Sequence, residues 1–185
     1  MQIETPRLIL RRWAAADLSP FAQMNRDPEV MKWMPQNLDR DQSDHLAAYA
    51  DGLFEQYGFG LFVLQLKVGN EFVGFTGLSV PRFTAPFTPC VEIGWRVAQA
   101  HWGQGYATEA AQAVLGLSFG QWGLKEVVSF TTAGNLSSRR VMEKIGMLRS
   151  PKEDFDHPSL GVDSPLKRHV LYRLGIDRWR EISGL

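Results

Sequence analysis

The feature that most constrains the fold is a stretch in which a strand pattern passes through a glycine turn into a helix pattern. Apolar and polar residues alternate through "CVEIGWRV", residues 90–97, which predicts a half-buried strand. Two glycines follow in "HWGQGYATEA", and residues 107–117 then carry alanine and aliphatic side chains at helical spacing. The β-branched stretch "KEVVSFTT", residues 125–132, predicts a second strand. This order predicts a right-handed crossover between two parallel strands.

The rest of the chain adds further strand and helix patterns to this unit. The predicted helices are Asp17–Asn25, Leu38–Tyr57 and Leu136–Ile145. The other predicted strands are Leu8–Trp13, a hairpin of two apolar runs joined around Gly69 and Asn70, Met147–Phe155 and Leu166–Leu174. Because no repeat or low-complexity linker interrupts these patterns, we expect residues 1–185 to form a single domain, a mixed sheet with helices on its faces.

Composition excludes several classes of function. The 185 residues are 44% hydrophobic and carry 20 basic and 20 acidic side chains, so a net charge of zero gives no field that would attract nucleic acid or an anionic membrane. No run approaches the roughly 18 apolar residues of a membrane span, and the charged start is unlike a signal peptide. We therefore expect a cytoplasmic protein. Four scattered histidines and a single cysteine, Cys90, predict neither a metal site nor a disulfide.

The glycine turn predicts an anion site. The first NH groups of a helix have no partner within the helix, and the helix dipole is positive at that end, so residues 102–108 could bind a pyrophosphate. Gly103 and Gly105 would let phosphates approach the main chain, and Thr108 could add a hydroxyl. The alternative is a tight turn only, with Thr108 and Glu109 capping the helix. A dinucleotide fingerprint is excluded because Thr108 replaces its third glycine, and a phosphate loop is excluded because Gly-Lys-Ser/Thr is absent.

Two motifs resemble the GNAT N-acetyltransferases. "VAQAHWGQGYATEA" is similar to the coenzyme A signature of that superfamily, Gln/Arg-x-x-Gly-x-Gly/Ala, and "NLSSRRVMEKIGM" is similar to its second motif, in which an Asn opens a helix. With the N-terminal "TPRLILRRW", the chain most resembles the RimJ/RimL-like branch over nearly its whole length. The resemblance implies an α/β (α+β) fold. We expect a mixed, mostly antiparallel, twisted sheet of about six or seven strands, with helices on both faces and a parallel pair formed by residues 90–97 and 125–132.

The resemblance also implies acetyl-CoA as the cosubstrate, without a metal. Main-chain groups around Val97 would pair with the pantetheine arm, and one NH there would face the thioester oxygen. Asn135 would hydrogen-bond the pantetheine, although an Asn in that place could equally cap the following helix. At Trp102 the family usually has Gln or Arg, so a side-chain contact to phosphate is lost there. The NH groups expected to hold the pyrophosphate are those of Trp102, Gly103, Gln104, Gly105, Tyr106, Ala107 and Thr108.

Amine acetylation needs a base and benefits from an acid. Glu92 has the opposite parity to the apolar residues of its strand and so faces the other side, where it could deprotonate an amine directly or through a water. The alternative is a solvated carboxylate paired with Arg96. Many GNAT enzymes place a Tyr acid where this chain has Met142, which cannot donate a proton. Ser138, one turn earlier on the predicted helix, is the candidate acid, and a local capping hydroxyl is the alternative.

The acceptor is an amine that the sequence does not name. We favour a small-molecule amine, with the N-terminus of a protein such as a ribosomal protein as the alternative. Trp33, Asp156 and His157 are candidate acceptor contacts, and a surface turn is the alternative for the last two. Because Met142 cannot act as an acid, a non-catalytic acyl-CoA-binding sensor or interaction domain is a further alternative. The fold also suggests a homodimer that uses the last strands.

Overall fold

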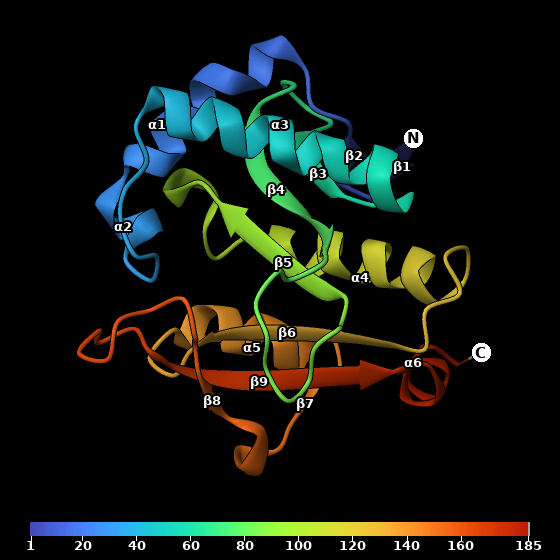
Figure 1. Cartoon of the computed structure of the whole chain (residues 1–185). Coiled ribbons are helices and arrows are strands. Elements are labelled where there is room, and N and C mark those ends of the chain that lie inside the picture. Colours follow the sequence, from blue (N-terminus) through green and yellow to red (C-terminus); the bar gives the residue numbers. More distant parts are fainter. Residues whose placement is uncertain (185) are drawn as a thin grey trace. The chain divides into compact units, whose positions relative to one another are not determined.

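The computed structural model describes residues 1–184, which form two compact units. The first unit comprises residues 1–79 and 94–114, and the second comprises residues 80–93 and the chain from residue 115 onward. Figure 1 follows the chain through its elements from blue at the N-terminus to red at the C-terminus. Strand β5 (Glu92–Val97) and helix α4 (Tyr106–Phe119) each contribute residues to both units. The single domain expected from the sequence stays a prediction.

Antiparallel strands build the sheet of the first unit. They are, in order across the sheet, β1 (Gln2–Glu4), β2 (Leu8–Arg11), β3 (Leu61–Leu66) and β4 (Phe72–Ser79), and β5 adjoins β4. Strands β3 and β4 form the hairpin predicted around Gly69 and Asn70, with Val63 opposite Phe75. Val63 is fully buried, so the β-branched and aromatic side chains of this pair pack into the core, where they favour strand structure.

The helices of the first unit begin at residues that satisfy their free NH groups. The unit holds α1 (Leu18–Arg26), α2 (Pro28–Met31) and α3 (Arg40–Tyr57). At the start of α3 the Asp39 carboxylate accepts from the Gln42 NH at 2.8 Å, and the Gln42 side chain accepts from the Asp39 NH at 3.0 Å. This reciprocal capping box explains why the helix starts there. Short α2, which the sequence pattern did not predict, starts with Pro28 and is capped by Asp27.

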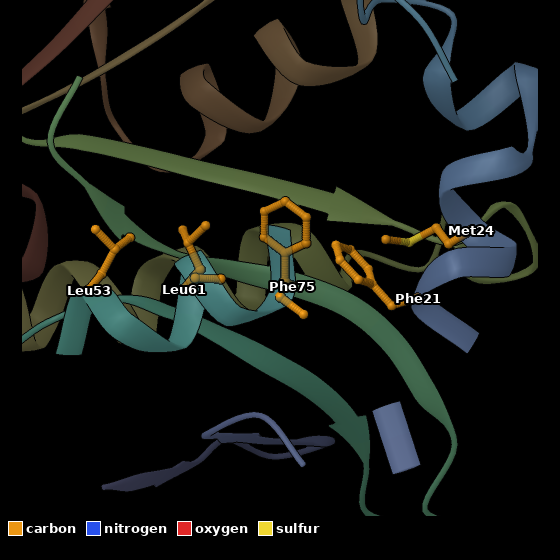
Figure 2. Close-up of a cluster of buried hydrophobic side chains, with 7 residues drawn as sticks. Phe21, Met24, Leu53, Leu61 and Phe75 are labelled. Atoms are coloured by element: carbon orange, nitrogen blue, oxygen red, sulfur yellow. The ribbon is translucent and has the colours of Figure 1, made fainter. Parts of the chain in front are cut away.

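Aromatic and aliphatic side chains from α1, α3, β3 and β4 form the core of the first unit. Figure 2 shows Phe21, Met24, Leu53, Leu61 and Phe75 turned toward one another, and all five are at most 8% exposed. Burying each such side chain contributes about 1.5–3 kcal/mol. The ring of Trp13 lies 4.7 Å from that of Phe21, and its indole NH donates to the Leu61 carbonyl at 2.7 Å. The segment after β2 is therefore fixed against the core.

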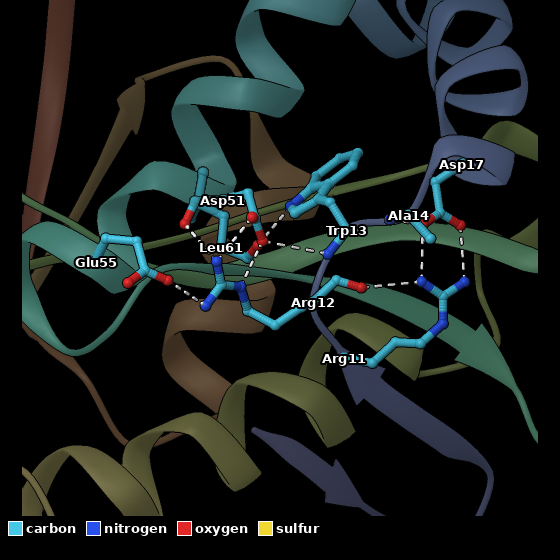
Figure 3. A network of polar contacts seen from close by, with 8 residues as sticks. All are labelled: Arg11, Arg12, Trp13, Ala14, Asp17, Asp51, Glu55 and Leu61. Carbon is cyan, nitrogen blue, oxygen red and sulfur yellow. Dashed lines mark hydrogen bonds and ion pairs between the residues drawn. The ribbon is translucent and has the colours of Figure 1, made fainter.

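Two adjacent arginines connect the end of β2 to the helices of this unit, as Figure 3 shows. The Arg11 guanidinium makes two hydrogen bonds of 2.7 Å to the buried Asp17 carboxylate. Arg12 pairs with Asp51 at 2.5 Å and with Glu55 at 2.9 Å on α3. The hydrogen bond from Arg12 lowers the pKa of Asp51. Bidentate pairs of this kind fix orientation as well as adding energy.

The second unit carries the parallel strand pair. Glu92 at the start of β5 lies opposite Val128 of β6 (Glu126–Thr132), parallel to it. Strand β9 (Arg168–Gly175) pairs antiparallel with β6 and with the two-residue strands β7 (Leu148–Arg149) and β8 (Phe155–Asp156). Helices α5 (Leu136–Lys144) and α6 (Ile176–Ser183) complete the unit. A cluster of Val128, Phe155 and Leu171, with aromatic side chains packed around it, forms its core.

The predicted mixed sheet with one parallel pair is confirmed, and its details differ from expectation. The described residues contain nine strands, mostly antiparallel, and six α-helices. The strand predicted over Met147–Phe155 is wrong as one element, because the chain forms a 3-10 turn at Pro151–Glu153 between β7 and β8. Pro151 has no NH to donate to a sheet ladder. No helix is predicted from the sequence for the residues that form α6.

A substitution at Gly74 tests how closely β4 and β5 approach each other. A Cβ at this position would lie 2.0 Å from the Arg96 carbonyl oxygen and 2.9 Å from the Val97 Cα. Gly74→Ala should therefore lower the free energy of unfolding by about 3 kcal/mol, because main chain rather than a side chain must move. Urea denaturation measures the change. The control Gly52→Ala, at an exposed position of α3 with no atom within 4 Å of the new Cβ, should instead stabilise by up to about 1 kcal/mol. Equal effects of the two substitutions would contradict this account.

Candidate active site

The predicted anion turn has the backbone conformation that only glycine adopts without strain. Strand β5 ends at Val97, a 3-10 turn covers Gln99–His101, and α4 begins one residue after Gly105. Gly103 and Gly105 have φ angles of 73° and 82°, in the left-handed region that costs other residues roughly 1–2 kcal/mol. Successive NH groups in such a conformation form a concave nest for an anion.

Main-chain NH groups of the turn remain available for a ligand. The first of them to enter the helix ladder is the Glu109 NH, which donates to Gly105 at 3.0 Å. Among the hydrogen bonds of the described first unit, none uses an NH from Gly103 through Thr108 as its donor. The Trp102 NH, by contrast, donates to the Gln99 carbonyl at 3.1 Å. The Trp102 NH is thus already bonded, and the pyrophosphate site expected over residues 102–108 stays a prediction.

Arg7 holds the turn and the first turn of α4 together. Its Nε donates to the Glu109 carboxylate at 2.6 Å, and its Nη1 donates to the Gln104 carbonyl at 2.8 Å. The Thr5 hydroxyl and the Arg7 NH both donate to the other Glu109 oxygen, at 2.6 and 2.9 Å. The Arg7 guanidinium also stacks 4.6 Å from the centre of the Tyr106 ring. Sequence reasoning missed this clamp because its members are about a hundred residues apart.

The same contacts decide the role of Glu109. Burial raises the pKa of Glu109, but hydrogen bonds from Thr5 and Arg7 outweigh burial and leave the pKa lowered. Both carboxylate oxygens have donors, so Glu109 is a stabilising anion at the positive end of α4 rather than a base.

Trp102 connects the turn to the end of β5. Its indole NH donates to the Val97 carbonyl at 2.7 Å, and the next NH, that of Ala98, donates to Val73 at 2.9 Å. A residue that departs from the family signature thus fixes the strand end from which main-chain contacts to pantetheine were predicted. The Val97 carbonyl is already an acceptor for Trp102. The predicted contact of Val97 with the pantetheine stays a prediction.

The second unit positions Asn135 and Ser138 at the start of α5. The Asn135 side-chain oxygen accepts from the Ser138 NH at 3.3 Å, and its amide donates to the Thr131 hydroxyl at 3.0 Å. The capping role is therefore present, and the role in binding pantetheine stays a prediction. Ser138 is half-buried, whereas Met142 is only 1% exposed. Met142 is thus a core side chain, and the assignment of Ser138 as acid stays a prediction.

Glu92 opens β5 and is half-buried. Burial, and then the charge of Glu92, raise the pKa of the Cys90 thiol to about 11. The thiol is therefore protonated near neutral pH and is a poor nucleophile.

Within the part of the chain that the structure describes, no helix is long and apolar enough to cross a membrane. In that same part, no three His, Cys, Asp or Glu side chains could together hold a metal ion.

The acidic stretch "KEDFDHP" is explained by arginines on neighbouring elements of the second unit. Glu153 pairs with Arg173 at 2.9 Å, Asp156 pairs with Arg168 at 3.2 Å, and Asp154 pairs with Arg149. The hydrogen bond from Arg149 lowers the pKa of Asp154. The cluster is thus a set of ion pairs around β8 and β9, and Asp156 itself is exposed.

His157 belongs to an aromatic cluster in the second unit. Its ring lies 4.6 Å from Phe83 and 5.0 Å from His169. Burial lowers the pKa of both histidines.

Trp33 belongs to the first unit, where it is half-buried after α2 and lies 5.6 Å from the Lys32 ammonium. The acceptor roles of Trp33, Asp156 and His157 stay predictions.

Comparisons with known proteins agree with this geometry. Residues 7–148 match the family described as "Acetyltransferase (GNAT) domain". The chain belongs to the GNAT acetyltransferase family. Among curated relatives, this acetyltransferase is 33% identical over 147 residues to Uncharacterized protein YkkB of Bacillus subtilis (strain 168), covering 79% of this chain and 84% of that protein. It is 31% identical over 160 residues to the FsC-acetyl coenzyme A-N(2)-transacetylase of Aspergillus fumigatus, covering 82% and 67%.

The fold agrees equally well with a solved relative. The acetyltransferase (GNAT family) from Bacillus anthracis superimposes with a TM-score of 0.78 at 25% identity, covering 96% of this chain and 99% of that one. The predictions of the GNAT fold and of acyltransferase activity are therefore confirmed. GNAT acetyltransferases use acetyl-CoA. The assignment to the RimJ/RimL-like branch stays a prediction.

Removing the Arg7 side chain should weaken coenzyme binding. In Arg7→Met the Gln104 carbonyl and the Glu109 carboxylate each lose a charge-assisted hydrogen bond, and such a bond contributes about 1.5–3 kcal/mol. We expect the Kd for coenzyme A, measured by isothermal titration calorimetry, to rise at least about tenfold. The matched control is Arg40→Met, which should leave Kd unchanged, because exposed Arg40 pairs with Asp44 one helical turn away on α3. An unchanged Kd in a folded Arg7→Met protein would contradict the expectation that the Arg7 contacts support coenzyme binding.

Half-buried His157 and buried His169 should make stability depend on pH. A histidine has an ordinary pKa of about 6.5, and burial lowers the pKa of His157 and His169 in the folded chain. Between the folded and unfolded pKa values the unfolded chain binds more protons, so this stability is complete above about pH 6.5 and is lost as pH falls below it. Urea denaturation from pH 8 to pH 5 should show this decline. His157→Phe combined with His169→Phe should reduce this decline, while His45→Gln, at an exposed position of α3, should not. An unaltered slope in the double variant is the contrary result.

Proposed function

We propose that this acetyltransferase transfers the acetyl group of acetyl-CoA to a primary amine by direct attack in a ternary complex. The observation that carries the proposal is the turn from Gly103 to Thr108, whose main-chain NH groups have no acceptor in the described first unit. Their arrangement at the positive end of α4 suits a pyrophosphate. The name of the Aspergillus fumigatus relative, FsC-acetyl coenzyme A-N(2)-transacetylase, agrees with nitrogen as the accepting atom.

The proposed reaction needs three functions from the chain. Glu92, directly or through a water, takes a proton from the ammonium form of the acceptor, and the free amine then attacks the thioester carbonyl. A main-chain NH near Val97 donates to the oxyanion that develops there. The carbon–sulfur bond breaks as the amide forms, the amide nitrogen gives its second proton to solvent, and Ser138 or solvent gives the departing thiolate a proton. No covalent bond to the enzyme is required.

The size of the base requirement depends on the acceptor. A lysine-like amine with a pKa of about 10.4 is neutral in roughly one molecule in two thousand at pH 7. A peptide α-amine with a pKa of about 7.7–8.0 is neutral in roughly one in ten. The leaving thiol, with a pKa of about 8.5, is a tolerable leaving group even without an acid. The base should therefore matter more than the acid, and most with a strongly basic small-molecule amine, the acceptor class we favour over a protein N-terminus.

Two measurements on the purified protein test the proposal. Thermal unfolding with coenzyme A at about 100 times its Kd should raise the midpoint by about 5 to 10 degrees, whereas NAD should not. Acetyl-CoA should then release free thiol in the presence of an amine from a panel of small amines and N-terminal peptides. The absence of a midpoint shift with coenzyme A would sink the proposal. A shift without thiol release from any amine would favour a non-catalytic acyl-CoA sensor.

Substitutions rank the two candidate catalytic residues. Glu92→Gln should lower kcat/KM for a strongly basic amine by about a hundredfold or more, the range for loss of a general base. Ser138→Ala should lower it by no more than about tenfold, because the thiolate leaves without help. Glu126→Gln and Ser137→Ala are matched controls, since both residues are exposed on β6 and α5, and neither should change kcat/KM. The reverse order of effects would remove Glu92 from the mechanism.

A further inference from the structure

Arg96 is a deeply set cation on the strand that approaches the predicted thioester site. It lies on β5 in the first unit, one residue before Val97. Its side chain is partly accessible to solvent, yet burial lowers the pKa of the guanidinium to about 10. Neither the family signature nor the proposed transfer of the acetyl group assigns this residue a role.

The neighbours of Arg96 hold it in place without neutralising it. Its Nη1 donates to the Asn25 side-chain oxygen at 2.6 Å, and its guanidinium lies 5.4 Å from the centre of the Phe75 ring. Asn25 of α1 is fully buried and donates in turn to the Ser43 hydroxyl of α3 at 3.1 Å. The Ser43 hydroxyl donates to the Asp39 carbonyl at 2.7 Å. The hydrogen-bond acceptor of Arg96, the Asn25 side-chain oxygen, is therefore held in place, and it belongs to an uncharged amide.

Other arginines of the first unit have the carboxylate partner that Arg96 lacks within the described part of that unit. Arg7, Arg11 and Arg12 each pair with a carboxylate at 2.7 Å or less. Within the first unit as the structure describes it, no carboxylate forms an ion pair with Arg96, and its one hydrogen bond uses one of five NH donors. A cation removed from water without a counter-ion is unfavourable. Anchoring Asn25 does not require a charge, so the contact with Asn25 leaves the charge unexplained.

We propose that Arg96 binds a carboxylate of the acceptor, so that the substrate is a small amine that also carries a carboxylate group. A guanidinium presents parallel NH donors that match the two oxygens of a carboxylate. Successive residues of a strand are only about 3.3 Å apart, so the bound anion would lie about one arginine side chain away from the main chain beside Val97, a separation that a small amine with a carboxylate can span. This inference rests on the proposed acetyl transfer at that strand end, and it narrows the acceptor to compounds of the amino-acid class.

Thermal unfolding with product analogues tests the inference without needing turnover. The protein is first saturated with coenzyme A, and the shift that this produces tests the proposed function by itself. N-acetylglycine, N-acetyl-β-alanine and N-acetylglutamate are then compared with their carboxamides and with N-acetyl-O-phosphoethanolamine. We expect at least one acid to raise the midpoint further, with its carboxamide binding at least about tenfold more weakly.

Variants of Arg96 separate a ligand contact from a structural one. In Arg96→Met the preference for the acid over the carboxamide should disappear, while the shift with coenzyme A remains. Arg96→Lys keeps the charge without the paired donors and should retain an intermediate preference, which covers the case in which Arg96→Met does not fold. The control Arg26→Met, at an exposed position of α1, should behave as the unsubstituted chain.

Four outcomes would overturn the inference even if coenzyme A binds as proposed. If acids and carboxamides stabilise the unsubstituted chain equally, or not at all, a carboxylate is not what the site recognises. If the preference for acids is equal in the unsubstituted chain, Arg96→Lys and Arg96→Met, Arg96 is not the group that binds the carboxylate. Stronger stabilisation by the phosphorylated analogue than by every acid would replace the carboxylate by a phosphate. A lower midpoint for Arg96→Met with an unchanged preference would assign Arg96 a structural role only.

Discussion

The unsatisfied NH groups at the start of α4 are the constraint on which the rest of the site depends. Within the first unit as described, the NH groups from Gly103 through Thr108 have no acceptor, and Gly103 and Gly105 adopt left-handed conformations that turn the chain before the helix begins. Arg7 takes the Gln104 carbonyl, which removes an acceptor that the first helical turn could otherwise use. A helix end with free donors and a fixed approach is preorganised for an anion, so little ordering remains to oppose binding.

Strand β5 connects this anion site to the chemistry that we propose. Gly74 allows its backbone to pass close to β4, and the Trp102 indole fixes its end by bonding the Val97 carbonyl. Arg96 lies one residue earlier, with a positive charge that its own unit does not neutralise. Coenzyme, thioester and acceptor would thus meet along a few residues of one strand, whose position is set by packing rather than by the ligands.

The sequence predicts the local part of this arrangement and not the long-range part. Alternation through residues 90–97 and helical spacing through 107–117 predict the strand, the turn and the helix, because both periods are local properties. The link from Arg7 to Glu109 joins residues 102 positions apart, and no periodicity reports such a contact. Pro151, which has no NH to donate to a sheet ladder, interrupts the strand expected over Met147–Phe155. The capping role of Asn135 follows from residue type alone, whereas a contact with the coenzyme does not.

Backbone amide resonances measured during a titration with coenzyme A test the central claim most directly. The account predicts that the NH signals of Gly103 through Thr108 shift most and move downfield as they acquire phosphate acceptors, while the Trp102 NH, already bonded to Gln99, shifts less. If coenzyme A binds and the amides from Gly103 to Thr108 stay where they are, the turn is not the phosphate site and the account is wrong.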